Sequence, residues 1–250
     1  MERKKIALIT GATSGMGRQF VLQIQEAYPW LDEIWVIARN RERLAVLQEE
    51  ICGIRSFPMD ITSQAELRIL QRVLEEENPK LQFLVNSAGA GIQKKIEDTE
   101  VADLWNMTQL NVSALTAVTG ICLPYCAKAC QVICLASGAA FVPQPGFAVY
   151  AATKAYVLSF SRALRREWKG RLTVTAVCPG PVDTPFLEKM GGKEHMPAYK
   201  KWFLAKPEAV VKKALRDSAK GKELSIYGIS VKALHMLCKI LPHRLILRFL

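Results

Sequence analysis

The sequence has no apolar run long enough to cross a membrane. Of its 250 residues 50% are hydrophobic, but no segment reaches the roughly 20 apolar residues that a spanning helix needs. The first apolar stretch, Ile6 to Ile9, is too short for the hydrophobic region of a secretory signal and runs directly into a Gly-rich loop. We therefore expect a cytoplasmic protein that is neither secreted nor transmembrane.

Repeats, low-complexity tracts and Ser/Gly-rich linkers are also missing. The balance of 50% hydrophobic and 23% charged residues is that of a globular protein, which excludes intrinsic disorder and fibrous repeats. At this length one α/β domain can bury a substantial core without disulfides or metals. We therefore expect residues 1–250 to form a single domain.

Histidine is scarce, with three in the chain, all from His195 onward. The seven cysteines lie mostly in apolar runs, where a thiol packs as a small hydrophobe. Four of them recur at a regular interval that suggests a metal cluster, namely Cys122, Cys126, Cys130 and Cys134. Zinc sites, however, favour C-x2-C pairs or mixtures of Cys and His. We favour packing in the core over a metal site, and an odd number of thiols fits a reducing cytosol.

Acidic residues are few near the C-terminus. The formal net charge is +11, yet residues 1–188 carry 20 Lys and Arg against 19 Asp and Glu, while residues 189–250 carry 14 against 4. Such an excess invites a nucleic-acid or anionic-membrane partner. Zinc-finger, homeodomain and RNP-type patterns are missing. We therefore expect no nucleic-acid binding, and the membrane alternative remains open.

Short β-branched runs alternate with helical patterns along the chain. Strands are predicted at residues 6–10, 33–38, 54–59, 82–86, 132–137, 173–178 and 223–227. Helices are predicted at residues 18–27, 41–51, 101–123 and 150–167, with a further helix that follows Thr62. Strands separated by helices require right-handed crossovers and hence a parallel sheet. The prediction is a Rossmann-like, doubly wound α/β fold with about seven strands and helices on both faces.

The first strand is followed by a Gly-rich turn, Thr10-Gly11-Ala12-Thr13-Ser14-Gly15-Met16-Gly17, and then by a helix. Glycines here let the backbone approach a pyrophosphate, whose charge lies at the helix N-terminus. Tight turns also need glycine for geometry alone, but the place of this turn at the first crossover favours dinucleotide binding.

The second strand is followed by Arg39, at the position where an acidic side chain would bind an adenosine ribose. Arginine there would attract the 2′-phosphate, which favours NADP(H) over NAD(H). The alternative is a solvated arginine at a strand end. Arg41 and Arg43, at the start of the next helix, are more often surface residues.

Tyr150 and Lys154 lie four residues apart on a predicted helix, and hence on one face. A nearby cation lowers the pKa of a phenol towards working pH, so the tyrosine can exchange a proton with a substrate oxygen. Alone, this pair is common in helices; together with the Gly-rich turn it becomes specific.

These motifs together resemble those of the short-chain dehydrogenases/reductases along nearly the whole chain. The matching positions are the turn at 10–17, Asp60, Asn86-Ser87-Ala88-Gly89, Asn111, Ser137, Tyr150, Lys154, Pro179-Gly180 and Thr184. Two positions depart from the usual pattern. Ser87 stands where the family usually has Asn, and Met16 replaces the more frequent Ile, a swap of similar volume.

The resemblance implies a role for each matching residue. Tyr150 is expected to be the general acid or base, Ser137 to hold the substrate oxygen, Lys154 to bind the nicotinamide ribose and lower the pKa of the tyrosine, and Asn111 to place a proton-relaying water. The residues expected at the cofactor are Gly11, Thr13, Ser14, Gly15, Met16, Gly17, Arg39, Asp60, Ile61, Asn86, Ala88, Gly89, Tyr150, Lys154, Pro179, Val182 and Thr184.

The resemblance also implies that substrate choice lies in the loop after Ser137 and in a lid at about residues 186–206. These segments hold Phe141, Val142, Phe147, Phe186, Met190, Met196, Tyr199, Trp202 and Phe203. A pocket so lined favours a bulky apolar ketone or alcohol, such as a hydroxysteroid. Several of these residues can equally be core or lid contacts, and a 3-oxoacyl thioester or small ketone is the second substrate hypothesis.

The segment 229–250 is a basic amphipathic extension. An apolar stripe is predicted at Val231, Leu234, Leu237, Cys238 and Leu241, with Lys232, Lys239, Arg244 and Arg248 supplying charge. Such a helix can lie on an anionic membrane, cover a subunit interface or cover the substrate cleft. It resembles the basic, apolar tails of steroid-active members of the family.

The leading hypothesis is an NADP(H)-dependent carbonyl reductase or alcohol dehydrogenase, working as a homodimer or homotetramer, as the resemblance implies. Two other classes are a cofactor-sensing regulatory protein that kept the fold and a peripheral membrane binding module. Loss of Tyr150 or Lys154 would have favoured the regulatory class, and both are present.

Overall fold

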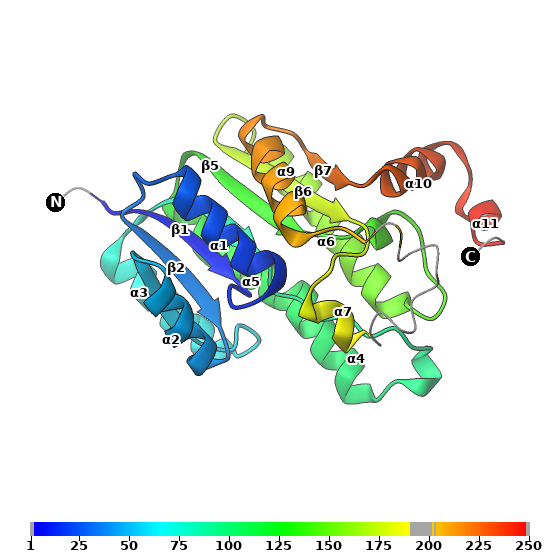
Figure 1. Ribbon diagram of the computed structural model, residues 1–250, viewed down its shortest axis with the longest axis horizontal. Coiled ribbons are helices and arrows are strands. Elements are labelled where there is room, and N and C mark those ends of the chain that lie inside the picture. Colours follow the sequence, from blue (N-terminus) through cyan, green and yellow to red (C-terminus); the bar gives the residue numbers. More distant parts are fainter. Residues whose placement is uncertain (1–2, 191–201, 203, 249–250) are drawn as a thin grey trace.

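A computed structural model describes residues 3–190, 202 and 204–248. Within them seven strands form one parallel sheet in the order β3-β2-β1-β4-β5-β6-β7 (Figure 1). The strands are β1 Lys5–Thr10, β2 Glu33–Ala38, β3 Ile54–Pro58, β4 Lys80–Asn86, β5 Cys126–Leu135, β6 Leu172–Pro179 and β7 Leu224–Tyr227. The predicted doubly wound parallel sheet is confirmed.

Helices cover both faces of this sheet. Those of eight residues or more are α1 Gly15–Ala27, α2 Arg41–Glu50, α3 Gln64–Glu77, α4 Val101–Thr108, α5 Leu115–Cys122, α6 Ala148–Glu167, α9 Pro207–Ala219 and α10 Ile229–Ile240. The shorter ones are η1 Ile96–Asp98, the π-turn η2 Gln109–Ala114, η3 Leu123–Tyr125, η4 Gly138–Phe141, α7 Pro185–Lys189 and α11 His243–Ile246.

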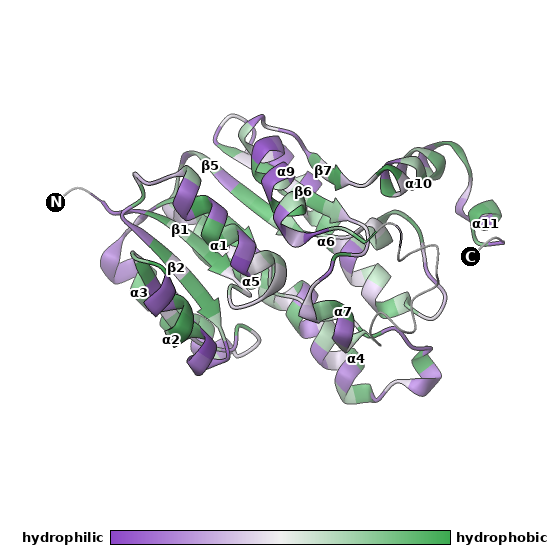
Figure 2. Cartoon of the chain, in the orientation of Figure 1, coloured by the Kyte–Doolittle hydropathy of each residue, from purple (hydrophilic) through white to green (hydrophobic). Residues whose placement is uncertain are grey.

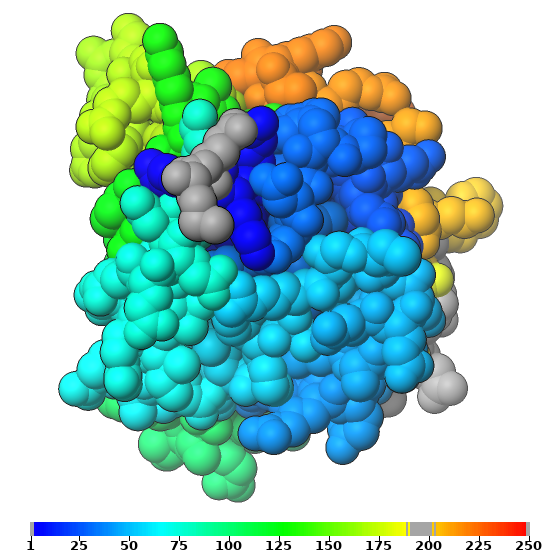
Figure 3. Space-filling view, turned by 90° about the vertical axis from the view of Figure 1, so that its left-hand side faces the viewer, coloured from blue at the N-terminus to red at the C-terminus, as the bar shows by residue number. Residues whose placement is uncertain are grey.

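Alternation along the strands divides the core into two layers. In β1, Ala7 and Ile9 pack with α1, α2 and α9, whereas Ile6 and Leu8 pack with α3, α5 and α6 on the other face. Figure 3 shows the β3 side of the molecule, where blue and cyan residues from the first third of the chain form most of the surface in view.

The predicted helices over 41–51 and 150–167 differ from α2 and α6 by one or two residues at one end, and the other three differ in ways that have a physical cause. The first begins at Gly15, inside the predicted loop, because the Gly-rich turn supplies the first turn of α1. The third begins after Ser63 rather than Thr62: the Ser63 hydroxyl accepts a hydrogen bond from the Glu66 N–H, as a helix-capping serine does. The helix predicted over 101–123 is divided by the π-turn η2.

The fifth strand is longer and ends earlier than predicted. β5 begins at Cys126 and stops at Leu135, two residues before Ser137. Its register with β4 shifts between Cys126 and Gln131, and within this stretch Ala129 adopts a φ of 66°. A left-handed alanine in a bulge carries no periodic signal, so the pattern of the sequence did not reveal this start.

The four evenly spaced cysteines follow one path from the end of α5 along β5. Cys122, Cys130 and Cys134 are buried and Cys126 is half-buried. Burial raises the pKa of the Cys122 and Cys134 thiols. They pack as small apolar side chains of the core.

No helix in the described part of the chain is both long enough and apolar enough to span a membrane.

Candidate active site

The predicted site residues gather at the carboxyl ends of the central strands. Thr10, at the end of β1, links two of these ends: its hydroxyl accepts hydrogen bonds from the N–H groups of Ser87 and Ala88, both at 3.1 Å. Thr10 was part of the predicted turn but had no predicted role. Its hydrogen bonds fix the loop after β4 against the Gly-rich turn.

The Gly-rich turn forms a close-packed cradle at the start of α1. A Cβ atom at Gly17 would lie 2.1 Å from the carbonyl oxygen of Gly11, and one at Gly11, where φ is 65°, would lie 2.8 Å from the backbone of Ala88. Within the described residues Ser14 makes no side-chain cap, and the first turn of α1 has no acidic residue. The free N–H groups and the helix dipole therefore fit a pyrophosphate.

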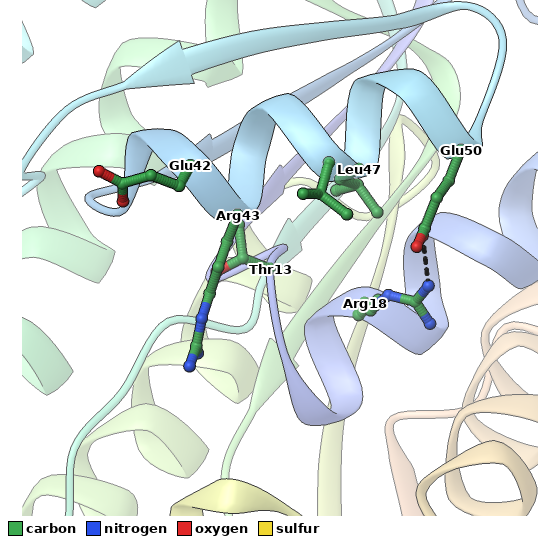
Figure 4. Close-up of a pocket in the computed structure, with 7 residues that line it drawn as sticks. Thr13, Arg18, Glu42, Arg43, Leu47 and Glu50 are labelled. Atoms are coloured by element: carbon green, nitrogen blue, oxygen red, sulfur yellow. Dashed lines mark hydrogen bonds and ion pairs between the residues drawn. The ribbon is translucent and has the colours of Figure 1, made fainter.

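A cavity of about 270 Å³ lies between this turn and α2. Thr13 and Arg43 line it, and Figure 4 shows the Arg43 side chain extending from α2 past Thr13. At the other end Arg18 pairs with Glu50 at 2.5 Å. Arg43 is exposed, as predicted for a surface residue, and its contact with the cavity depends on how α2 lies over the turn.

Arg39 stands at the end of β2, with its side chain 71% exposed. Its guanidinium lies 3.9 Å from a carboxylate oxygen of Asp60. The other carboxylate oxygen of Asp60 accepts hydrogen bonds from the Thr62 N–H and hydroxyl, and Ile61 is buried beside it. A cation and a carboxylate thus border the same end of the cradle.

Asn86 lies at the predicted place, but its side chain faces the core. Its amide donates a hydrogen bond to the Thr119 hydroxyl at 2.9 Å and contacts the Cys134 sulfur at 3.8 Å. The side chain therefore ties β4 to α5, and contact between Asn86 and the cofactor ribose stays a prediction for its main chain.

Asn111 is held within the π-turn η2, and its amide is bonded at both ends. Its oxygen accepts from the Ala90 N–H at 2.8 Å, and its NH₂ donates to the Ala90 carbonyl at 2.8 Å and to the Thr153 hydroxyl at 3.0 Å. Short π-helical segments within α-helices often mark functional sites. This side chain therefore fixes the loop after β4 against α6.

Ser137, Tyr150 and Lys154 come together as predicted. The Ser137 hydroxyl accepts a hydrogen bond from the Ala139 N–H at 3.1 Å, and it interacts with the Tyr150 phenol in the sense that lowers the pKa of that phenol. The Lys154 amine donates to the Leu135 carbonyl at 2.8 Å and lies 5.6 Å from the centre of the Tyr150 ring. One hydroxyl, one phenol and one ammonium therefore share a buried corner.

The electrostatics of this corner differ from the expectation. Burial raises the pKa of Tyr150 to about 12, although its hydrogen bond with Ser137 lowers it. Burial lowers the pKa of Lys154 to about 8. The expected lowering of the tyrosine pKa by Lys154 is wrong for this structure, because desolvation of the phenol is the largest effect. Tyr150 is therefore a protonated phenol near neutral pH.

An apolar wall surrounds the phenol. The ring of Phe147 stacks on Tyr150 with centroids 4.3 Å apart, and Phe186 lies 5.9 Å away. A Cβ atom at Gly91 would lie 2.7 Å from the Phe186 ring and 3.0 Å from Tyr150, so glycine leaves room for both rings. Met190 also packs against this cluster. Gly91 was not among the predicted site residues.

Three further residues predicted at the substrate pocket, all within the part of the chain that the structure describes, do not join this wall. Phe141 packs in the main core against His235, with ring centroids 4.3 Å apart. Trp202 is 89% exposed. Val142 is buried and lines a second cavity on the outer side of α6. Met196, Tyr199 and Phe203 lie outside the described residues, as does most of the predicted lid.

The segment after β6 returns to the cradle. Val182 pairs with Ala205, and the Asp183 N–H donates to the Ala205 carbonyl at 2.9 Å. A Cβ atom at Gly15 would lie 3.1 Å from the Thr184 side chain. This contact places Thr184 beside the Gly-rich turn. Pro179 is the last residue of β6.

The geometry agrees with a comparison to known sequences. Residues 5–195 match the sequence profile of the family described as short chain dehydrogenase. The chain is a member of this family. As a short-chain dehydrogenase/reductase, it is an oxidoreductase that uses a nicotinamide cofactor.

Several known proteins resemble this short-chain dehydrogenase. Sulfoacetaldehyde reductase 2 of Chromohalobacter salexigens is 32% identical over 198 residues, which cover 76% of this chain and 77% of the relative. The 11-beta-hydroxysteroid dehydrogenase-like 3 protein of Arabidopsis thaliana is 29% identical over 188 residues, covering 72% and 60%. A short-chain dehydrogenase from Sphingobium yanoikuyae in complex with NADPH has a TM-score of 0.77 at 23% identity, covers 96% of both chains and shows the fold.

The pKa of Lys154 predicts how catalysis depends on pH. The ammonium is present below its pKa of about 8 and is lost above it, while Tyr150 stays protonated up to about 12. We expect kcat/KM for the nicotinamide cofactor to be level near neutral pH and to fall as pH rises through about 8. Initial rates across pH measure this, and a profile that stays level up to the ordinary lysine value of 10.5 would contradict it.

Proposed function

We propose that this short-chain dehydrogenase transfers a hydride between NADP(H) and a bulky apolar ketone or secondary alcohol. The observation that carries this proposal is the position of the buried Tyr150 phenol, beside the Ser137 hydroxyl and an apolar wall that includes Phe147 and Phe186. The two hydroxyl groups that would hydrogen-bond to the oxygen of the substrate lie next to an apolar surface that would bind its hydrocarbon part. A hydroxysteroid-like substrate fits this combination.

The residues divide the proton chemistry between them. The cofactor, when bound, supplies or accepts the hydride. In reduction the Tyr150 phenol gives its proton to the carbonyl oxygen of the substrate as that oxygen gains charge, and in oxidation the phenolate takes the proton back. The Ser137 hydroxyl donates a hydrogen bond to the same oxygen, and the Lys154 ammonium binds the nicotinamide ribose.

The proposal is tested by following NADPH oxidation with a panel of ketones, and NADP⁺ reduction with the matching alcohols. Turnover should be fastest with bulky apolar ketones. Faster turnover of 3-oxoacyl thioesters or small ketones would replace the substrate class and keep the reaction. An absence of turnover, with NADPH still bound, would assign the chain to the cofactor-sensing class.

Cofactor preference is tested at the basic side chains near the cradle. We expect Arg39→Asp to raise KM for NADPH by about tenfold, because hydrogen bonds to charged groups contribute roughly 1.5–3 kcal/mol. KM for NADH should change much less, because NADH has no 2′-phosphate. Arg41→Asp is the control, since Arg41 is exposed at the start of α2.

Arg43→Asp completes this comparison, because Arg43 lines the cavity beside Thr13. A selective loss of NADPH affinity in Arg43→Asp would place the phosphate in that cavity. Equal effects of Arg39→Asp on both cofactors would show that Arg39 is a solvated surface residue and would remove the basis for an NADP(H) preference.

A further inference from the structure

The helix α10 has apolar residues on two opposite sides. One side packs on the body of the molecule: Val231 is 7% exposed, and its methyl groups fill the space that a Cβ atom would take at Gly138 and Gly180. On the same side the ring of His235 lies on Phe141. This inner side accounts for only part of the predicted apolar stripe, because Leu237 and Leu241 are exposed.

The outer side of α10 presents large apolar residues to solvent. Ile229, Met236 and Ile240 are 83%, 54% and 74% exposed. They lie at positions i, i+7 and i+11, which fall on one stripe of a helix. Figure 1 shows α10 and α11 at the end of the molecule opposite α2 and α3, and Figure 2 shows apolar residues along both. Exposed apolar residues continue after α10 as Leu241, Leu245 and Leu247. We call the stripe of Ile229, Met236 and Ile240 the outer apolar face.

The charge around the outer apolar face has one sign. Glu223 is the last acidic residue of the chain, so residues 224–250 contain no carboxylate side chain. Glu223 itself pairs with Arg162 at 2.7 Å. The cations that follow it are Lys232, Lys239, Arg244 and Arg248, all of them exposed. An apolar stripe bordered by cations alone is complementary to a surface that is apolar inside and anionic outside.

We propose that the outer apolar face docks on the surface of an anionic lipid bilayer. Apolar side chains enter the acyl boundary while the cations contact the headgroups, as in other interfacial amphipathic helices. A second copy of the chain is the less favourable occupant. A symmetric contact brings the same patch of each copy together, so Lys232 and Lys239 would face cations without an acidic partner.

This docking surface is connected to the candidate active site. Val231 on the inner side of α10 contacts Gly138 and Gly180, which directly follow Ser137 and Pro179 in the chain. Docking through the outer side therefore brings the bilayer to the same end of the sheet as the catalytic corner. An apolar substrate dissolved in the bilayer would then be concentrated near the pocket.

The test is flotation of the full-length protein with two kinds of vesicle, one of phosphatidylcholine alone and one containing phosphatidylglycerol. We expect binding to the anionic vesicles to be at least about tenfold stronger, because each Lys or Arg near an anionic surface adds to the attraction. Added salt should weaken that binding by screening.

Two variants and two matched controls separate the contribution of apolar side chains to vesicle binding from the contribution of positive charge. Ile240→Asp and Lys239→Glu should each lower binding to the anionic vesicles, by about tenfold or more for Ile240→Asp. The controls change exposed residues of the same types on other helices: Ile69→Asp on α3 and Lys212→Glu on α9. These controls should bind as the wild type does.

The proposal is overturned if neither vesicle binds the wild-type protein, or if all four variants lose binding equally. Sedimentation velocity without lipid gives the third decisive result. A wild-type oligomer that dissociates in Ile240→Asp would assign the outer apolar face to a second copy. NADPH binding, measured for every variant, reports whether the fold is intact independently of membrane binding.

Discussion

Replacing Tyr150 with phenylalanine is expected to lower kcat for ketone reduction by about 10²–10⁴-fold, the usual contribution of a general acid. The substitution keeps the ring, which stacks on Phe147 and contacts Phe186, and removes only the hydroxyl. Cofactor binding should therefore stay near that of the wild type. Steady-state NADPH oxidation and a fluorescence titration with NADPH measure the two quantities separately.

Tyr156→Phe is the matched control for this prediction. Tyr156 lies on the same helix, α6, and its hydroxyl hydrogen-bonds with that of Thr116 at 2.9 Å, away from Ser137. Its loss should leave kcat near the wild-type value. A Tyr150→Phe enzyme that reduces ketones as fast as Tyr156→Phe would exclude the phenol as the proton donor.

The second large effect is expected at Gly17. Because the new Cβ of Gly17→Ala would lie 2.1 Å from the Gly11 carbonyl oxygen, the turn or the start of α1 must move. Overpacking of this kind costs about 1–3 kcal/mol of stability. The displaced N–H groups should also lose most of the affinity for NADPH. Urea unfolding and an NADPH titration measure these changes.

Gly120→Ala is the control for backbone and side-chain propensity. Gly120 lies in α5, and no described atom is within 4 Å of a Cβ placed there. This variant should be more stable by about 0.5–1 kcal/mol, the gain of alanine over glycine within a helix. If both variants gain stability and bind NADPH normally, the close-packed cradle does not require glycine at position 17.

The periodicity of the sequence was enough to predict the architecture. The continuous apolar run of β1 and the helical spacing in α1 depend on neighbouring residues, so they are readable without the fold. Parallel strands separated by helices bring their carboxyl ends to one edge. That rule agrees with the positions of the Gly-rich turn and Ser137, whereas the resemblance to a known family was what joined them to the Tyr150–Lys154 pair on α6.

Tertiary structure alone decided the roles of several side chains. Asn111 bonds to Ala90, and Thr10 bonds to Ser87 and Ala88. Asn86 turns into the core and not toward the cleft. These choices depend on partners from 21 to 78 residues away in sequence, whose positions no local pattern contains.

The electrostatics of the site were likewise a property of the folded chain. Spacing correctly placed Tyr150 and Lys154 on one face of a helix, but it predicted a lowered pKa for the phenol, whereas burial raises it to about 12. Desolvation depends on everything that surrounds a group. The sequence determined which residues meet at the end of the sheet. Only the tertiary structure decided how strongly burial desolvates Tyr150 and Lys154 there, and which side of α10 remains exposed.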